Sequence, residues 1–182
     1  MVEIRGDVVR LREFRSDDLD DSMRIVGDPR VTRNLSFDPL SREQQEQRLI
    51  DAVKRSSATP RTEYYFAIAT IDVDRLVGFA RLGLNGVNAA KLGYAVAAEH
   101  WRKGYAYNAC RSLIDFGFDK LNLHRISAAI GPENKASIKL VNKLGFSLEG
   151  EIRDHVHTNG AWRNSLLYSL LESDKRKIHV LS

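Results

Sequence analysis

The chain is short of cysteine, proline and long apolar runs. Its single cysteine, Cys110, excludes a disulfide framework and any zinc cluster built from cysteines. Four prolines, with 29% charged and 43% hydrophobic residues, exclude a disordered or low-complexity chain. No apolar run approaches the roughly 20 residues of a membrane span, and residues 1–6 lack the apolar core of a signal peptide. We therefore expect a soluble, cytoplasmic protein.

The charge excess is also small. Twenty-eight Lys and Arg against 24 Asp and Glu leave a net charge of +4. A polyanionic cofactor would satisfy this excess as well as nucleic acid would, so the charge alone does not predict DNA or RNA as a partner. No internal repeat or Gly-, Pro- or Ser-rich linker divides the chain. We expect one domain over residues 1–182, long enough to bury a real core.

The first part of the chain mixes strand and helix patterns. Residues 8–12 predict a strand, and Ser16 is typical of the N-cap of a following helix. Ser41 with Gln44 is a capping-box pattern and predicts a second helix. Three apolar residues are expected to form its buried face: Leu49, Ile50 and Val53.

Strand periodicity follows in three apolar runs, at residues 64–70, 76–82 and 91–96. Turn signals at residues 71–75 and 85–88 separate these runs. Three strands joined by such short turns predict an antiparallel meander.

The strongest helix pattern covers residues 106–121, where apolar residues recur on one face. Cys110 belongs to that face and is predicted to be a core residue, not a catalytic thiol. Four further elements are expected: a strand at 125–130, a helix at 134–144 ended by Gly145, and strands near 146–152 and 165–171. Strands that alternate with helices predict parallel pairing, so we expect an antiparallel front half and a partly parallel back half.

The turn before the strongest helix, residues 101–106, has the features of a phosphate-binding site. Gly104 permits a tight turn, and the free N–H groups of the first helical turn lie at the positive end of the helix. Arg102 and Lys103 add positive charge there. A plain surface turn has the same pattern, and neither the P-loop nor the dinucleotide glycine pattern is present.

A second informative segment, residues 131–137, places Asn134 and Ser137 at the start of the next helix. Asn134 is interpreted either as a simple helix cap or as a ligand-facing side chain. The second interpretation rests on the preference of ligands for the carboxyl ends of strands where a sheet divides.

Together the two segments resemble the GNAT superfamily of N-acetyltransferases, specifically its RimJ/RimL-like branch. The resemblance is close over residues 92–172 and looser before them. The residues that carry it are Gly93-Tyr94, Trp101 to Ala106, Leu123-His124-Arg125, Glu133-Asn134 with Ser137, Lys143 to Phe146, Glu149-Gly150, Arg153-Asp154, Gly160, and Leu167 to Leu170.

The resemblance implies an α/β (α+β) fold with a mixed central sheet of about six to seven strands, splayed in the middle and flanked by helices. It implies acetyl-CoA as the cofactor, with Asn134 at the pantetheine arm and Ser137 near the sulfur as the acid. The implied pyrophosphate cradle is the backbone of Arg102, Lys103, Gly104, Tyr105 and Ala106. The implied pantetheine edge is the strand Tyr94, Ala95 and Val96.

Two departures from the family pattern leave the catalytic groups open. Val141 stands where many members have a tyrosine acid, and Ala90 to Leu92 contain no carboxylate where many members have a glutamate. Asn164 stands where an aspartate is frequent. The candidate bases are Glu99, Glu149, Glu151, Asp154, His155 and His157, or a water molecule. Phe37 and Trp162 are candidates for the wall of an acceptor pocket.

The expected activity is direct attack of a primary amine on acetyl-CoA. The amine would be a protein N-terminal α-amine or belong to a small molecule such as an antibiotic. A non-catalytic CoA-binding regulatory module is the alternative, and an RNA-associated protein is a third hypothesis. We expect no metal, since the pair His155 and His157 lacks a third ligand. Dimers are frequent in the family, so the resemblance also raises a homodimer.

Overall fold

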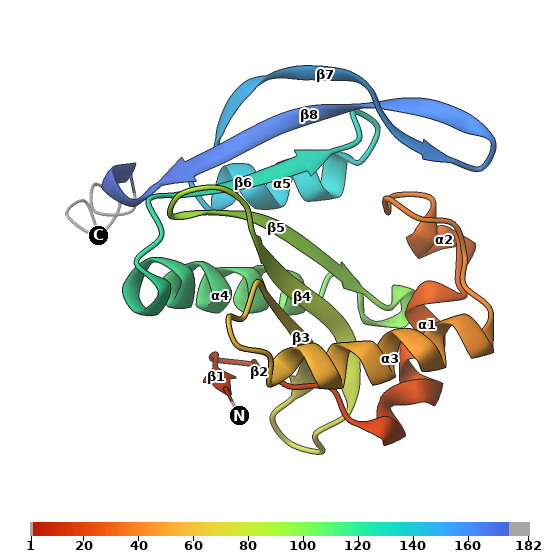
Figure 1. The fold of residues 1–182 in the computed structure, drawn as a ribbon. Coiled ribbons are helices and arrows are strands. Elements are labelled where there is room, and N and C mark those ends of the chain that lie inside the picture. The colour runs from red at the N-terminus through yellow and green to blue at the C-terminus, as the bar shows by residue number, and fades with distance from the viewer. Residues whose placement is uncertain (1, 175–182) are drawn as a thin grey trace.

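The computed structural model describes residues 2–174 (Figure 1). The expected domain of residues 1–182 also takes in residues that lie outside this range. Within it, eight strands form one mixed sheet in the order β1-β2-β3-β4-β5-β6-β8-β7. The strands are β1 (Ile4–Arg5), β2 (Val9–Arg12), β3 (Glu63–Thr70), β4 (Leu76–Leu84), β5 (Ala89–Val96), β6 (Arg125–Ile130), β7 (Ser147–Thr158) and β8 (Ala161–Leu171).

Helices cover both faces of the sheet. They are α1 (Leu19–Val26), α2 (Pro29–Thr32), α3 (Arg42–Ser56), α4 (Tyr105–Leu121) and α5 (Lys135–Lys143), with short 3-10 turns at Ser16–Asp18 and Ala98–His100. One core lies between the sheet and helices α4 and α5, and a second lies between the sheet and helices α1 and α3. None of the helices in the described range is long and apolar enough to cross a membrane.

The predicted front half is confirmed. Strands β2, β3, β4 and β5 pair antiparallel in chain order, and the predicted turns connect β3 to β4 and β4 to β5. The one strand not anticipated there is β1, which has two residues and pairs with β2.

The predicted partly parallel back half is confirmed, since β5 and β6 pair in parallel. β6 pairs next with β8 and antiparallel, so β7 forms the edge, an order that was not predicted. The reason is the turn Asn159-Gly160, in which both residues have positive φ, 53° and 73°. Such a two-residue turn joins β7 directly to β8 as a hairpin. β8 therefore lies between β6 and β7 (Figure 1).

The helix predictions hold best where one face is apolar. In α4, Ala109, Cys110, Leu113 and Phe118 are buried as expected. In α3 the capping box of Ser41 and Gln44 is confirmed.

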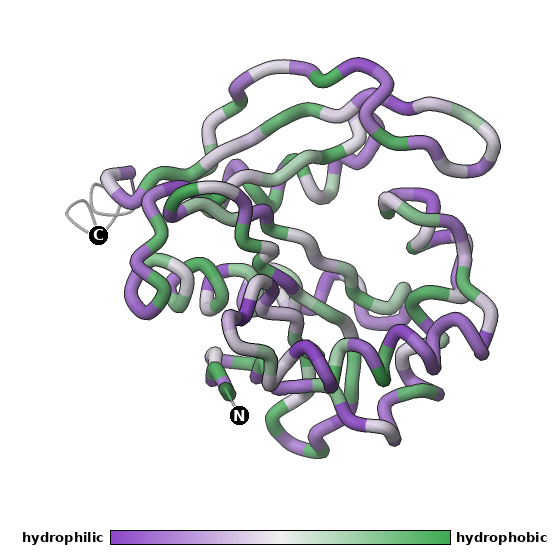
Figure 2. The backbone as a smooth tube through the Cα atoms, in the orientation of Figure 1, coloured by the Kyte–Doolittle hydropathy of each residue, from purple (hydrophilic) through white to green (hydrophobic). Residues whose placement is uncertain are grey.

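Two helix predictions are wrong. Ile50 and Val53 of α3 are 44% and 43% exposed, since this helix buries Gln45, Leu49 and Ala52 instead. Most of its other residues are hydrophilic, and the tube of α3 in Figure 2 is mainly purple. Ser16 caps no helix; it begins a 3-10 turn, where Asp18 accepts the Arg15 N–H at 2.8 Å.

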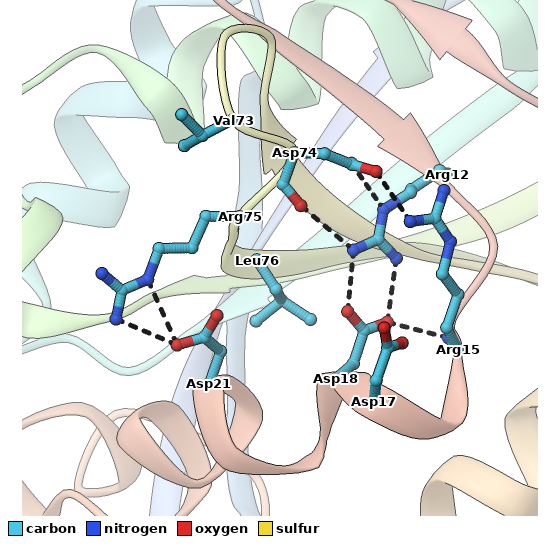
Figure 3. Close-up of a pocket in the computed structure, with 9 residues that line it drawn as sticks. All are labelled: Arg12, Arg15, Asp17, Asp18, Asp21, Val73, Asp74, Arg75 and Leu76. Atoms are coloured by element: carbon cyan, nitrogen blue, oxygen red, sulfur yellow. Dashed lines mark hydrogen bonds and ion pairs between the residues drawn. The ribbon is translucent and has the colours of Figure 1, made fainter.

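A cluster of arginines and aspartates fixes the β3–β4 turn to the start of the first helices (Figure 3). Arg12 is buried and donates to both carboxylate oxygens of Asp18, at 2.7 and 2.8 Å. Asp74 accepts from Arg10, Arg12 and Arg15 at 2.7 to 3.2 Å. Burial alone would raise the pKa of Asp74, but these three donors hold it well below its usual range. The cluster is internally compensated and therefore structural.

Replacement of Asp74 by Asn should lower the free energy of unfolding by about 2 kcal/mol at pH 7, because three cations lose their shared carboxylate. The lowered pKa of Asp74 stabilises the fold fully above the unfolded pKa of about 4, and this contribution is lost progressively as the pH falls from there toward the lower folded-state pKa. Urea unfolding should therefore show a smaller difference in stability between the wild type and Asp74→Asn at pH 3 than at pH 7. Asp20→Asn, at a carboxylate side chain that is 81% exposed, is the control and should change little.

Candidate functional site

The site begins where the sheet divides. The parallel ladder between β5 and β6 covers three residue pairs, ending at Lys91 and Ser127. Beyond it β5 runs on to Val96 and β6 to Ile130 without pairing to each other. The Ala97 N–H donates to Val77 of β4. Because the N–H and C=O groups of successive residues in a strand point to opposite edges, those of residues 94 and 96 point toward the gap. This is the splay that the sequence predicts.

The turn from residue 101 to 106 lies between the end of β5 and the start of α4. Arg102 and Gly104 both have positive φ, 66° and 79°. No backbone hydrogen bond found within residues 2–174 uses the N–H groups of residues 102–107. Six consecutive amides are thus free at the positive end of a 17-residue helix, beside two cationic side chains. This geometry matches an anion-binding site made from the main chain.

Trp101 connects this turn to the splayed strand. Its indole N–H donates to the Val96 carbonyl at 2.8 Å. The contact holds the turn against the end of β5, and it was not predicted from the sequence. The sequence did contain a signal for this contact. A tryptophan close to a strand end needs an acceptor for its indole N–H when its ring is partly buried.

Asn134 and Ser137 lie at the start of α5, across the gap from β5. Asn134 caps the helix, since its Oδ1 accepts the Ser137 N–H at 3.1 Å. The cap leaves the amide group of Asn134 without a partner among the described residues. Both interpretations of Asn134 are therefore compatible with the geometry, because capping uses the oxygen only.

Tyr94 carries the least expected feature of the site. Its hydroxyl is buried and has no hydrogen-bond partner within the described range. Burial, with a smaller contribution from Cys110, raises its pKa well above the usual value, and the nearby Ser137 offsets this only in part. Ser137 is close to the hydroxyl without forming a hydrogen bond. A buried hydroxyl left unpaired costs stability and marks a place where a ligand group can bind.

His155 is the base candidate with the most suitable surroundings. It is half-buried, and its Nδ1 lies 2.9 Å from Ser165 Oγ on β8. Burial, followed by the charge of Lys91, lowers its pKa below the ordinary value of 6.5. The ring is therefore neutral at pH 7, and in the tautomer whose Nδ1–H donates to Ser165, Nε2 can accept a proton. Lys91, whose charge reaches His155, is the last residue of β5 that pairs with β6.

The carboxylate candidates are less suitable. Partial burial acts to raise the pKa of Glu99, but a hydrogen bond from Arg24 outweighs this effect and the pKa is lowered. Hydrogen bonds from Ser169 and then Arg125 lower the pKa of Glu149. A carboxylate held in its charged form is a weak proton acceptor.

The remaining base candidates lie on exposed parts of β7. Asp154 occupies an irregular position with φ 47°, and its N–H donates to Asn164. Glu151 accepts a hydrogen bond from the Asn164 side chain. The His157 ring packs edge-on against Trp162. Of the two aromatic residues considered for the acceptor wall, Trp162 is 62% exposed and Phe37 packs against Arg48.

The β7–β8 hairpin reaches across to the segment after α2. Arg163 donates to the main-chain carbonyls of Arg33 and Leu35 at 2.5 and 2.6 Å, and the Asn159 N–H donates to Asp38. These contacts join two segments more than 120 residues apart in sequence. Sequence patterns do not contain them, because each depends on the tertiary fold.

Comparisons with known proteins agree with this geometry. The family model of the acetyltransferase (GNAT) domain matches residues 9–147. The chain is 33% identical to the uncharacterized N-acetyltransferase p20 of Bacillus licheniformis, over 90% of this chain and 93% of that one. It is 30% identical to the ribosomal protein uS5 alanine N-acetyltransferase of Escherichia coli, over 61% and 59%.

A solved structure agrees in fold. The spermidine N-acetyltransferase of Vibrio cholerae, crystallised with CoA and spermine, superposes with a TM-score of 0.78. The superposition covers 91% of this chain and 96% of that one, at 22% identity. At this identity the likeness concerns the fold alone.

Replacement of Tyr94 by Phe should raise the free energy of unfolding by about 1 kcal/mol, because it removes a buried hydroxyl without a partner and keeps the ring. Urea unfolding of the ligand-free protein measures this change. A less stable variant would contradict the prediction and would mean that the hydroxyl is paired within the protein.

Proposed function

The chain belongs to the acetyltransferase (GNAT) family, and from that premise we propose that it transfers the acetyl group of acetyl-CoA to a primary amine. The observation that carries this is the run of free amides at residues 102–107, beside the gap between β5 and β6. A site built from main-chain N–H groups and a helix end suits a pyrophosphate. The adjoining strand edge suits the amide groups of a pantetheine arm.

The residues present fit this cofactor. A Cβ built on Gly104 meets no atom within 4 Å, so the space above the free amides is open to a ligand. The unpaired Tyr94 hydroxyl and the free amide of Asn134 supply polar groups farther along the gap. When bound, acetyl-CoA would supply an activated acyl carbon and a thiolate leaving group.

The chain's own residues then handle protons and position. Nε2 of His155 accepts the proton that the attacking amine loses, while Ser165 fixes the orientation of the ring. Ser137, which lies close to Tyr94, would donate a proton on the other side of the gap. Val141 is fully buried in the core, so it leaves the acid role to these hydroxyl groups.

The direct test is release of free thiol from acetyl-CoA with a panel of amines. The panel should contain a peptide with a free N-terminus, a polyamine and an amino acid whose amine is not in the α position. Release that depends on the amine supports the proposal. Tight CoA binding without release for any amine would favour the non-catalytic regulatory module instead.

Replacement of Gly104 by Leu should weaken CoA binding by more than about tenfold, because the side chain enters the space above the amides. Gly86→Leu is a matched control: Gly86 has the same φ of 79° and the same open surroundings, but it lies in the β4–β5 turn. Both variants should lose about 1 kcal/mol of stability from backbone strain. Calorimetric titration with CoA that gave equal affinities for the two variants would refute the cradle.

Replacement of His155 by Gln should lower kcat/KM about 100-fold at pH 7, the usual effect of losing a general base. In the wild type, kcat/KM should rise as the pH increases through the lowered pKa of His155, below 6.5. The variant should lose that acidic limb. His157→Gln, at an exposed ring on the same strand, should keep both the rate and the pH profile. An unchanged profile in His155→Gln would transfer the base role to another group.

A further inference from the structure

A second pocket, of about 420 Å³, lies on the α3 side of β3 and β4. Three arginines line it, Arg48 and Arg55 from α3 and Arg81 from β4, together with Glu63 and Tyr65 from β3. The structural comparisons and the proposed chemistry assign no role to this pocket.

The charges of this pocket do not balance. Glu63 is shared by Arg81, at 2.9 Å, and Arg55, at 3.4 Å. Arg48 has no carboxylate within 4.0 Å anywhere in residues 2–174. In contrast to the arginines around Asp74, this guanidinium lacks a counter-ion.

Arg48 is nevertheless held in place. Its guanidinium carbon lies 4.4 Å from the centre of the Phe37 ring, 5.7 Å from Tyr65 and 5.9 Å from Phe79. Aromatic contacts of this kind orient the planar group and displace water from its faces. The Tyr65 hydroxyl accepts from this guanidinium, and no carboxylate of the described residues reaches its other N–H groups. A fixed guanidinium with such donors left over matches a carboxylate.

The pocket is connected to the splay through Arg81. The stem of Arg81 crosses Gly93, where an added Cβ would lie 3.2 Å from its Cγ. Gly93 is two residues beyond Lys91, the last residue of β5 that pairs with β6. Burial and then the charge of Arg81 lower the pKa of Lys91, and burial and then the charge of Lys91 lower the pKa of His155, so the charge of each side chain reaches the next. The pocket therefore adjoins the place where the acceptor amine would react.

We propose that the acceptor carries a carboxylate in addition to its primary amine, and that Arg48 binds this carboxylate while the amine reaches the splay. The proposal rests on the proposed acetyl transfer and specifies its substrate class. A polyamine is disfavoured, since a second cationic group would meet uncompensated positive charge. The carboxylate belongs either to a small amino acid or to an acidic side chain near a peptide N-terminus.

The test compares acceptors that differ only in charge, in the thiol-release assay. The small-molecule arm uses 4-aminobutyrate, its amide and 1,4-diaminobutane. The peptide arm uses two peptides that differ by Asp or Asn at the second residue. The wild type should prefer the carboxylate in at least one arm, by about tenfold or more in kcat/KM, and the preferred arm identifies the source. Equal rates, or preference for the diamine, would overturn the proposal and leave acetyl transfer intact.

Variants of Arg48 separate recognition from folding. Arg48→Gln should raise KM for the carboxylate acceptor about tenfold and leave KM for the neutral acceptor unchanged. Arg48→Lys should restore binding only in part, because an ammonium group lacks the planar pair of donors. Arg42→Gln is the control, since Arg42 lies on the same helix and bonds only to exposed Asp20. Equal effects of Arg48→Gln on both acceptors would overturn the proposal.

A binding measurement keeps the two proposals distinguishable. Calorimetric titration of 4-aminobutyrate and of the Asp peptide into the CoA-loaded protein reports recognition without turnover. If no amine releases thiol, the proposal of acetyl transfer fails. The titration still tests whether the pocket binds a carboxylate, and weaker binding by Arg48→Gln would support that role. Identical titrations of both ligands for wild type and variant would reject it.

Discussion

The separation of β5 from β6 is the constraint on which the rest of the site depends. Two parallel strands that pair over three residues and then diverge leave main-chain groups without partners inside the molecule. The protein maintains this arrangement because each strand is secured on its other edge, β5 by β4 and β6 by β8. The helices that follow β5 and β6, α4 and α5, begin at the same open end, so free amides, a capped asparagine and a hydroxyl surround one gap.

Arginine serves two opposite purposes in this fold. At the β3–β4 turn, Arg12 is buried against Asp18 and Asp74, and every charge there has a counter-charge close by. On the α3 side of the sheet, Arg48 is held by three rings and has no such partner among the described residues. The first arrangement stabilises the chain itself, and the second leaves binding capacity for something outside it.

The elements with a local cause were predictable from the sequence. Gly104, Asn134 and Gly145 mark helix ends through their own conformational preferences, and the buried face of α4 follows from its periodicity. The Asn159-Gly160 turn was also legible as a strong short hairpin signal, and it would have predicted that β8 lies beside β7. The special states of Tyr94 and Arg48 were not predictable in this way. A hydroxyl without a hydrogen-bond partner and a guanidinium without a carboxylate depend on where residues distant in the sequence lie in the fold.

The contact between the β7–β8 hairpin and the segment after α2 has an evolutionary consequence. Arg163 binds the main-chain carbonyls of Arg33 and Leu35, so the bond does not require either of those side chains. Substitutions at residues 33 and 35 would therefore keep these two hydrogen bonds, although Leu35 also packs against the core between the sheet and helices α1 and α3. A segment attached in this way can change its exposed side chains without rebuilding the scaffold that supports it.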